Sequence, residues 1–239
     1  MMMVLAAAGV TSARAQEGGG GPLPPVGEVV AHARAVMDKN VKDVVCKVVV
    51  DTQLLDKTGK IEHDEHREGK ATLHGDDQDI ESSKVVRDGQ PMTADQLADE
   101  RNKVQRDKQK SKKKKSSDDD FDVMSPLSSK NVGEESFELL RREILWGRPT
   151  YVLKVTAKKH SPQQANGTLW IDAERFVELK GELVPSEMPA HADWIKVQEQ
   201  YVSGPQQIVV PSLLHIEGAG HMMFMHKQFR TTLRWSECR

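Results

Sequence analysis

The residues in this sequence best suited to chemistry are histidines and acids, and two histidine groups invite a metal hypothesis. His63, His66 and His74 lie in one polar stretch that also contains several acidic residues. Strand side chains alternate between faces, so His63 and His66 do not readily share an ion. The same parity argument separates His221 from His226. We therefore expect scattered surface histidines and no metal site.

Other kinds of chemistry leave no recognisable signature. The stretch "HDEH" lacks the spacing of the helical HExxH zinc motif. The sequence contains neither a G-x-S-x-G nucleophile elbow nor a phosphate-binding loop. We therefore expect no catalytic residues and no cofactor, and we do not expect an enzyme.

The two cysteines stand near opposite ends of the chain. Cys46 lies in a strand-like run, and Cys238 is the penultimate residue. In an oxidising compartment, a disulfide between them would tie the first strand to the last. The chain-entropy model gives so long a loop about 4–5 kcal/mol of stabilisation. Two unpaired thiols are the alternative, and the sequence leaves both open.

The N-terminus has the features of an export signal. Residues 1–15 contain a short apolar stretch that ends in Ala13-Arg14-Ala15, the small-x-small pattern of a cleavage site. The stretch is too short for a stable membrane anchor. We expect cleavage after Ala15 and a periplasmic or otherwise exported protein. The alternative is an alanine-rich terminus on a cytosolic protein.

The composition bounds the partners and the number of domains. The 239 residues carry a net charge of −2, so no strong field attracts nucleic acid or an anionic membrane. Aromatic residues make up 5% of the chain, too few to favour a base-stacking surface. We expect a flexible linker over 16–25 and one domain over 26–239, with no nucleic-acid partner.

Hydrophobic spacing predicts a helix followed by many strands. Residues 26–40 have an apolar stripe at helical spacing, and short β-like runs joined by turn residues fill the chain from 135 onward. Residues 61–75 are polar at nearly every position, so this strand must form an edge or lie on a solvated sheet. Residues 218–220, Gly-Ala-Gly, suggest a hairpin tip. About nine to eleven strands are expected, and so long a sheet must curl around its helix.

One segment interrupts this pattern. Residues 93–134 form a charged helical or disordered insertion, in which Thr93 can cap a helix. A lysine run within it is followed by an acidic block, so no net basic patch results. We expect this insertion to be largely solvated.

The stretch 166–184, "NGTLWIDAERFVELKGELV", sets which side chains face the core. An odd-numbered loop centred on Glu174 would pair Ile171 with Val177 and Leu169 with Leu179. This register gathers aliphatic side chains on one face. The other, mixed face then carries Thr168, Trp170, Phe176, Glu178, Lys180 and Glu182.

Four stretches resemble the LolA/LolB-like family, the lipoprotein-localisation fold, and in particular its uncharacterised exported bacterial members. They are "VVRDGQPMTADQLADER", "LLRREILWGRPTYVLKVTAK", "NGTLWID" and "IVVPSLLHIEGAGHMMFMHKQFRTTLRWSECR". The resemblance implies a mainly β (α+β) protein: a strongly curved antiparallel half-barrel with a helical lid over an apolar hollow. The lysine-rich insertion departs from the lipoprotein carrier itself.

This resemblance leads to two functional expectations. The first is a soluble envelope carrier that holds a lipid acyl chain, a lipoprotein or another hydrophobic ligand, with peripheral contact to a membrane. The second is a non-catalytic sensing or scaffold module of the same fold that binds an envelope protein. Seven residues are predicted to line the hollow: Val29, Val36, Met37, Leu169, Ile171, Val177 and Leu179.

Overall fold

The computed structural model describes residues 22–38, 43–74, 77–111, 125–128, 132–203, 208–222 and 225–239. The expected signal peptide and cleavage point therefore lie outside the described residues. Neither helix of the described segments is long and apolar enough to cross a bilayer.

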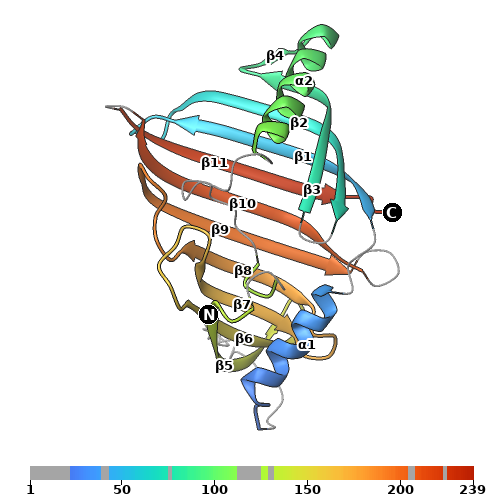
Figure 1. Cartoon of the computed structure of the whole chain (residues 1–239), viewed down its shortest axis with the longest axis vertical. Helices are drawn as coiled ribbons and strands as arrows, with labels where there is room; N and C mark the ends of the chain where they lie inside the picture. Colours follow the sequence, from blue (N-terminus) through green and yellow to red (C-terminus); the bar gives the residue numbers. More distant parts are fainter. Residues whose placement is uncertain are drawn as a thin grey trace, which may run out of the picture.

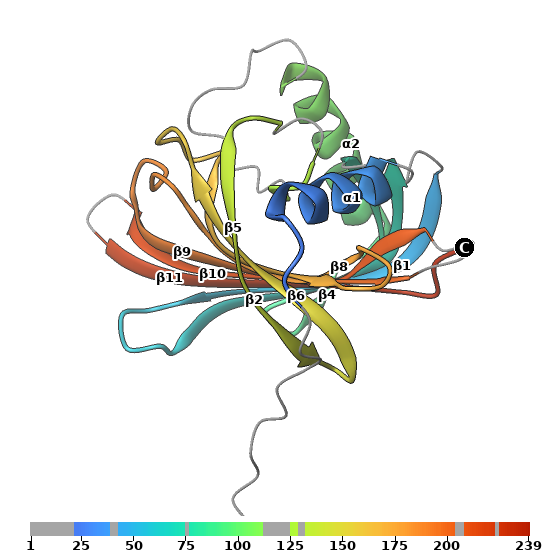
Figure 2. The same ribbon diagram turned by 90° about the horizontal axis from the view of Figure 1, so that it is seen from below.

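Eleven strands form a single open antiparallel sheet that curves around one helix (Figures 1 and 2), which confirms the expected fold class. The order of strands across the sheet is β4-β3-β2-β1-β11-β10-β9-β8-β7-β6-β5. The elements are α1 (Val26–Asp38), β1 (Val44–Leu55), β2 (Ile61–His74), β3 (Asp77–Arg87), β4 (Gln90–Pro91), α2 (Ala94–Ser111), β5 (Glu135–Leu145), β6 (Arg148–Ala157), β7 (Ala165–Asp172), β8 (Glu178–Pro185), β9 (Ala192–Ser203), β10 (Val209–Met222) and β11 (Met225–Ser236).

Helix α1 lies on the concave side of the sheet, across β5 to β8 (Figures 1 and 2). Its first turn is closed by Pro25, whose carbonyl oxygen accepts a hydrogen bond from the Glu28 amide at 3.0 Å. Val29, Val30 and Ala33 form its buried stripe and pack against β6, β7 and β9. The amphipathic stripe is thus matched to the apolar concave face of the sheet.

A second apolar cluster continues along the same concave face at β1, β2 and β11. It includes Val48, Leu233 and Trp235, and Leu214 of β10 contacts both clusters. Leu214 pairs directly with Leu233, and cross-strand partners share a face, so the two clusters form one continuous surface.

Cys46 and Cys238 are joined by a disulfide, with their Cα atoms 4.0 Å apart. Beside this disulfide, two backbone hydrogen bonds of 3.0 Å each join Val45 and Arg239. The chain's C-terminal end is therefore fixed to its first strand.

Helix α2 begins where the sequence predicts. The Gln96 amide donates to the Thr93 hydroxyl at 3.3 Å, and the Gln96 side chain accepts from the Thr93 amide at 2.8 Å, which forms a capping box. Glu100 of α2 forms ion pairs with Arg67 of β2 and Arg87 of β3. The first part of the expected insertion is thus attached to the sheet through charged side chains.

The polar strand β2 is internal, between β1 and β3, and its first half is largely exposed. The solvated-sheet alternative is therefore the one that the structure shows. The expected hairpin tip at 218–220 is wrong, because these residues lie within β10. Glycine is required there for space: a Cβ on Gly218 would lie 2.6 Å from the Phe229 ring, and one on Gly220 would lie 2.3 Å from the His191 carbonyl oxygen.

Candidate functional site

The candidate site is the contact between α1 and the apolar concave face of the sheet, and the seven residues predicted to line a hollow lie on the two sides of this contact. Val29, Leu169 and Ile171 are fully buried in one cluster, with Met37 at its margin. Val177 and Leu179 are buried in an adjoining cluster, against Val36. The helix therefore occupies the expected hollow and packs on its floor.

A second segment lies over the sheet together with α1. Residues 125–128 belong to the expected solvated insertion, but Leu127 is fully buried in the same cluster as α1. An Arg34 guanidinium nitrogen donates to the Pro126 carbonyl oxygen at 3.4 Å, which links this segment to the helix. We refer to α1 and residues 125–128 together as the cover, and to the sheet side chains beneath them as the floor.

The predicted register between β7 and β8 is wrong, because a β-bulge interrupts the pairing of the two strands. Leu169 pairs with Gly181, Trp170 pairs with Lys180, and Ile171 pairs with Glu178. Leu179 is the extra residue and has no partner in this ladder. The bulge turns Glu178 toward the floor, opposite to the face on which the sequence analysis placed it.

Phe176 was also assigned to the mixed outer face, and this too is wrong. Its backbone takes a left-handed conformation, with φ of 55°, at the end of the turn after β7. The ring lies 4.6 Å from the His32 ring of α1, between ring centroids, and packs against the floor. Trp170 lies on the convex face as expected. The Lys180 ammonium group lies over the Trp170 ring, and the Trp170 Nε1 donates to Glu143 at 2.7 Å.

Two buried carboxyl groups meet beneath the cover. Glu178 and Glu199 are 0% and 5% exposed. They meet beside Gly181, where an added Cβ would lie 2.6 Å from Glu199 Oε1 and 3.0 Å from Glu178 Oε1. Gly181 therefore provides the space in which the two carboxyls approach each other.

The pair is tied to both the cover and the floor. The Ser125 hydroxyl donates to Glu178 Oε2 at 2.9 Å, and the Tyr201 hydroxyl donates to Glu199 Oε2 at 3.0 Å. Burial raises the pKa of Glu178 well above its ordinary value, and the neighbouring Glu199 raises it further. Burial also raises the pKa of Glu199. Both pKa values are raised, and that of Glu178 more strongly, so the pair favours the uptake of a proton over two buried charges.

A third buried acid lies beside Arg34 of the cover. The Glu135 side chain is 1% exposed, and its carboxylate is 4.0 Å from the Arg34 guanidinium. Burial raises the pKa of Glu135 to about 7, because the loss of solvent outweighs the effect of the Arg34 charge. Arg34 also lies over the Phe137 ring. The contact between cover and floor thus contains three carboxyls with raised pKa values.

Glu178 was not predicted to be buried, because the expected register placed it on the outer face of the sheet. The signal for Glu199 is present in the sequence of β9. Ile195, Val197 and Glu199 alternate along one strand face, and the first two are buried on the floor. A single acid in line with two buried aliphatic residues marks a buried carboxyl.

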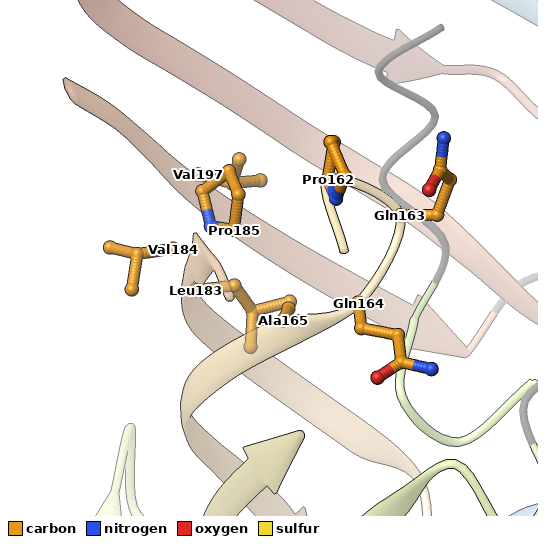
Figure 3. A pocket seen from close by; sticks show the side chains of 8 residues that line it. All are labelled: Pro162, Gln163, Gln164, Ala165, Leu183, Val184, Pro185 and Val197. Carbon is orange, nitrogen blue, oxygen red and sulfur yellow. The ribbon is translucent and has the colours of Figure 1, made fainter. Parts of the chain in front are cut away.

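Two pockets open at the surface. The pocket in Figure 3, between the loop at Pro162 and the end of β8, has a volume of about 10 Å³, which is room for about one water molecule. A pocket of about 310 Å³ over β8 to β10 is lined by the charged or polar side chains of Glu182, Lys196, Gln198, His215 and Glu217 and by the apolar side chains of Leu183, Val184 and Val197. A ligand that binds the floor itself would have to take the place of the cover.

No protein-family model matches this sequence, and no curated protein matches it significantly. Solved structures with a similar arrangement of elements include a putative outer-membrane lipoprotein-sorting protein domain from Vibrio parahaemolyticus, with 11% identity, 88% of this chain and 90% of that chain covered, and a TM-score of 0.45. A LolA superfamily protein from Nitrosomonas europaea has 13% identity, coverages of 91% and 94%, and a TM-score of 0.40. A DUF1329 family protein from Desulfovibrio piger has 14% identity, coverages of 91% and 93%, and a TM-score of 0.43.

Proposed function

We propose that this protein is a carrier that holds an acyl chain, or a hydrophobic ligand of similar shape, on the floor after the cover moves aside. The observation that carries this proposal is the contact between cover and floor. It joins apolar side chains, as a core does, but it also encloses the Glu178–Glu199 pair and Glu135. A contact built only for stability would not need buried acids, since their desolvation opposes closure.

The energies of closing and of binding are of similar size. Burial of Val29, Val30 and Leu127 contributes roughly 5–9 kcal/mol to the closed state, at about 1.5–3 kcal/mol for each side chain. An acyl chain that buries about ten methylenes gains about 8 kcal/mol on the same surface. Exchange of the cover for a ligand is therefore close to balanced, which is what a reversible carrier requires.

The buried acids shift this balance toward opening. In the closed state Glu178 must keep its proton, and a moved cover would let water reach and ionise it. The same holds for Glu135, whose pKa of about 7 lies near neutral pH. A neutral or mildly alkaline environment should thus favour the open, ligand-accepting state.

A second candidate function is the binding of a protein partner at the edge of the sheet. Strand β5 lies at one edge of the sheet, and its residues Leu140 and Ile144 are 41% and 47% exposed. Trp146, in the following turn, is 58% exposed. An edge strand with exposed apolar side chains can pair with an extended segment of another protein.

Export to an oxidising envelope compartment is part of the same proposal. The signal-like sequence of residues 1–15 and the disulfide between Cys46 and Cys238 both support it. Finding Gln16 at the start of the mature chain by mass spectrometry would agree with export, whereas an intact Met1 on cytosolic protein would contradict it.

The carrier function is tested by displacement of a fluorescent fatty-acyl probe from delipidated protein, with natural lipids and lipopeptides as competitors. We expect Leu169→Trp, which fills the floor, to weaken probe binding at least tenfold. Thr168→Trp is the matched control, because Thr168 is the next residue of β7 and lies on the opposite face. Its probe affinity should match the wild type.

A cover variant tests the same function in the opposite direction and serves if Leu169→Trp does not fold. Leu127→Ala removes apolar contact from the cover and leaves the sheet unchanged. If cover and ligand compete, this variant should bind the probe more tightly than the wild type although its fold is less stable. Absence of probe binding in the wild type and in Leu127→Ala would favour the protein-partner function.

A further inference from the structure

Asp193, His221 and His226 lie together on the face of the sheet away from α1. His221 and His226 are direct partners across the β10–β11 hairpin. The parity argument against their meeting is wrong, because it applies along one strand, whereas directly opposed residues of antiparallel strands share a face. Side chains alternate along β10, so His221 faces the opposite side from the concave residues Ile216 and Gly218. Its cross-strand partner His226 shares its face, so both rings lie on the convex face.

Asp193 lies between the two imidazoles. Its Oδ1 is 3.0 Å from His221 Nδ1, and its Oδ2 is 3.1 Å from His226 Nδ1. The ring centroids of the two histidines are 5.2 Å apart, with the rings nearly perpendicular. Each of the three residues offers one ligand atom, and these three atoms all lie within 4.8 Å of one another.

The backbone presents Asp193 independently of these side-chain contacts. A β-bulge between β9 and β10 pairs Ala219 with Trp194 and Gly220 with Ala192, so Asp193 has no partner in the ladder. The His221 amide donates to the His191 carbonyl oxygen at 2.8 Å and holds the bulge against β10. Gly220 fits this close approach because it lacks a Cβ. Bulges commonly re-aim a side chain in this way at functional sites.

We propose that Asp193, His221 and His226 bind one divalent cation of the zinc class, with water in the remaining coordination positions. Two imidazoles and one carboxylate are a ligand set that such cations accept. With metal–ligand bonds of about 2.0–2.1 Å, neighbouring tetrahedral ligands lie about 3.3–3.4 Å apart. The three ligand atoms now lie within 4.8 Å of one another, so a small rotation of exposed side chains brings them to that spacing.

The site is open and is separate from the floor. The side chains of Asp193, His221 and His226 are 37%, 57% and 38% exposed, so a cation can enter from solvent. Thiolate ligands play no part, since both cysteines of the chain form the disulfide. A bound cation would fasten the bulge of β9 to the β10–β11 hairpin.

The experiment is a calorimetric titration of zinc ions into untagged, chelator-stripped, oxidised protein. We expect one equivalent to bind, and His226→Ala and Asp193→Asn each to weaken binding at least tenfold. His63→Ala is the matched control: His63 also contacts a carboxylate, Asp88 at 3.1 Å, and is exposed, but it lacks a second histidine in that contact. Its zinc affinity should be unchanged.

Cobalt(II) substitution gives a second readout that does not depend on affinity alone. The wild type should show visible absorption bands of a low-coordinate nitrogen–oxygen site, and Asp193→Asn should lose them while circular dichroism shows an intact fold. His226→Gln replaces His226→Ala in the titration if the alanine variant does not fold. No binding by the wild type, or several weak equivalents that His226→Ala leaves unchanged, would overturn the proposal and indicate adventitious surface binding only.

Discussion

Ser125 donates a hydrogen bond of 2.9 Å to the buried carboxyl of Glu178, 53 residues further along the chain. This contact joins the cover to the floor through an acid that is fully enclosed. Because Glu178 also lies beside Glu199, the closed state depends on a proton held between the two carboxyls. The stability of the cover is therefore linked to pH.

Neutralising Glu178 should stabilise the protein at alkaline pH. Glu178→Gln keeps the volume and an acceptor for Ser125 but removes the need to bind a proton on folding. We expect the free energy of unfolding at pH 8 to rise, because the variant no longer has to take up a proton on folding. Glu182→Gln is the control on the same strand, since the Glu182 side chain is half-exposed and forms an ion pair with Lys180. Denaturant unfolding of both variants at pH 8 checks this, and a loss of stability in Glu178→Gln would contradict it.

Glu135 should make stability fall as the pH rises. Its pKa is raised on folding from 4.5 to about 7, so the folded chain binds more protons than the unfolded chain between these values. Its contribution is complete below about pH 4.5 and is lost as the pH rises through about 7. Melting temperatures of the wild type and Glu135→Gln, measured from pH 4.5 to pH 8, should converge at low pH and separate in favour of the variant at high pH.

The neighbouring Glu134 provides a control of opposite sign. Lys159 and Gln164 lower its pKa through hydrogen bonds, so its contribution is present above its unfolded pKa and is lost as the pH falls. Glu134→Gln should therefore leave the decline between pH 4.5 and pH 8 in place. Identical pH profiles for the wild type and Glu135→Gln would show that Glu135 does not titrate in this range.

Gly181→Ala should destabilise the closed state without strain in the backbone. The added Cβ would lie 2.6 Å from Glu199 Oε1 and 2.8 Å from its Cγ, so the acid pair would have to separate. We expect a loss of about 1–3 kcal/mol, as for other overpacked interiors. Combination with Glu199→Ala, which vacates the space, should recover most of the loss. Independent, additive effects of the two substitutions would argue against this contact.

Removal of the disulfide should lower stability substantially. The bond spans a sequence separation of 192, and loss of a native disulfide costs about 2–5 kcal/mol. Denaturant unfolding of the Cys46→Ser/Cys238→Ser double variant measures this cost. The backbone hydrogen bonds between Val45 and Arg239 should keep the native pairing, so far-ultraviolet circular dichroism should be unchanged. An unchanged denaturation midpoint would mean that the bond contributes nothing.

Hydrophobic spacing and strand number were enough to predict a long, curled antiparallel sheet around one helix, and Thr93 indicated the capped start of α2, because these features depend on regular periods and local hydrogen bonds. Features that break the period were missed. The bulge at Leu179 reverses the expected orientation of Glu178, and a left-handed Phe176 turns its ring to the floor. The meeting of His221 with His226 depends on the hairpin register, which the glycines of β10 obscured. Leu127 gave no periodic signal, because it stands in a short Ser-Pro-Leu-Ser segment and its burial depends on contacts far along the chain.

The most direct test of the carrier function is native mass spectrometry of the protein purified, without detergent, from the envelope of its own host. We expect a bound species with the mass of a lipid or an acylated peptide, released on collisional activation. Protein carrying Leu169→Trp and purified in the same way should hold far less of it, and Thr168→Trp should hold as much as the wild type. A bare polypeptide mass for the wild type, together with no binding of the fluorescent acyl probe, would contradict the account and leave the floor as an ordinary core.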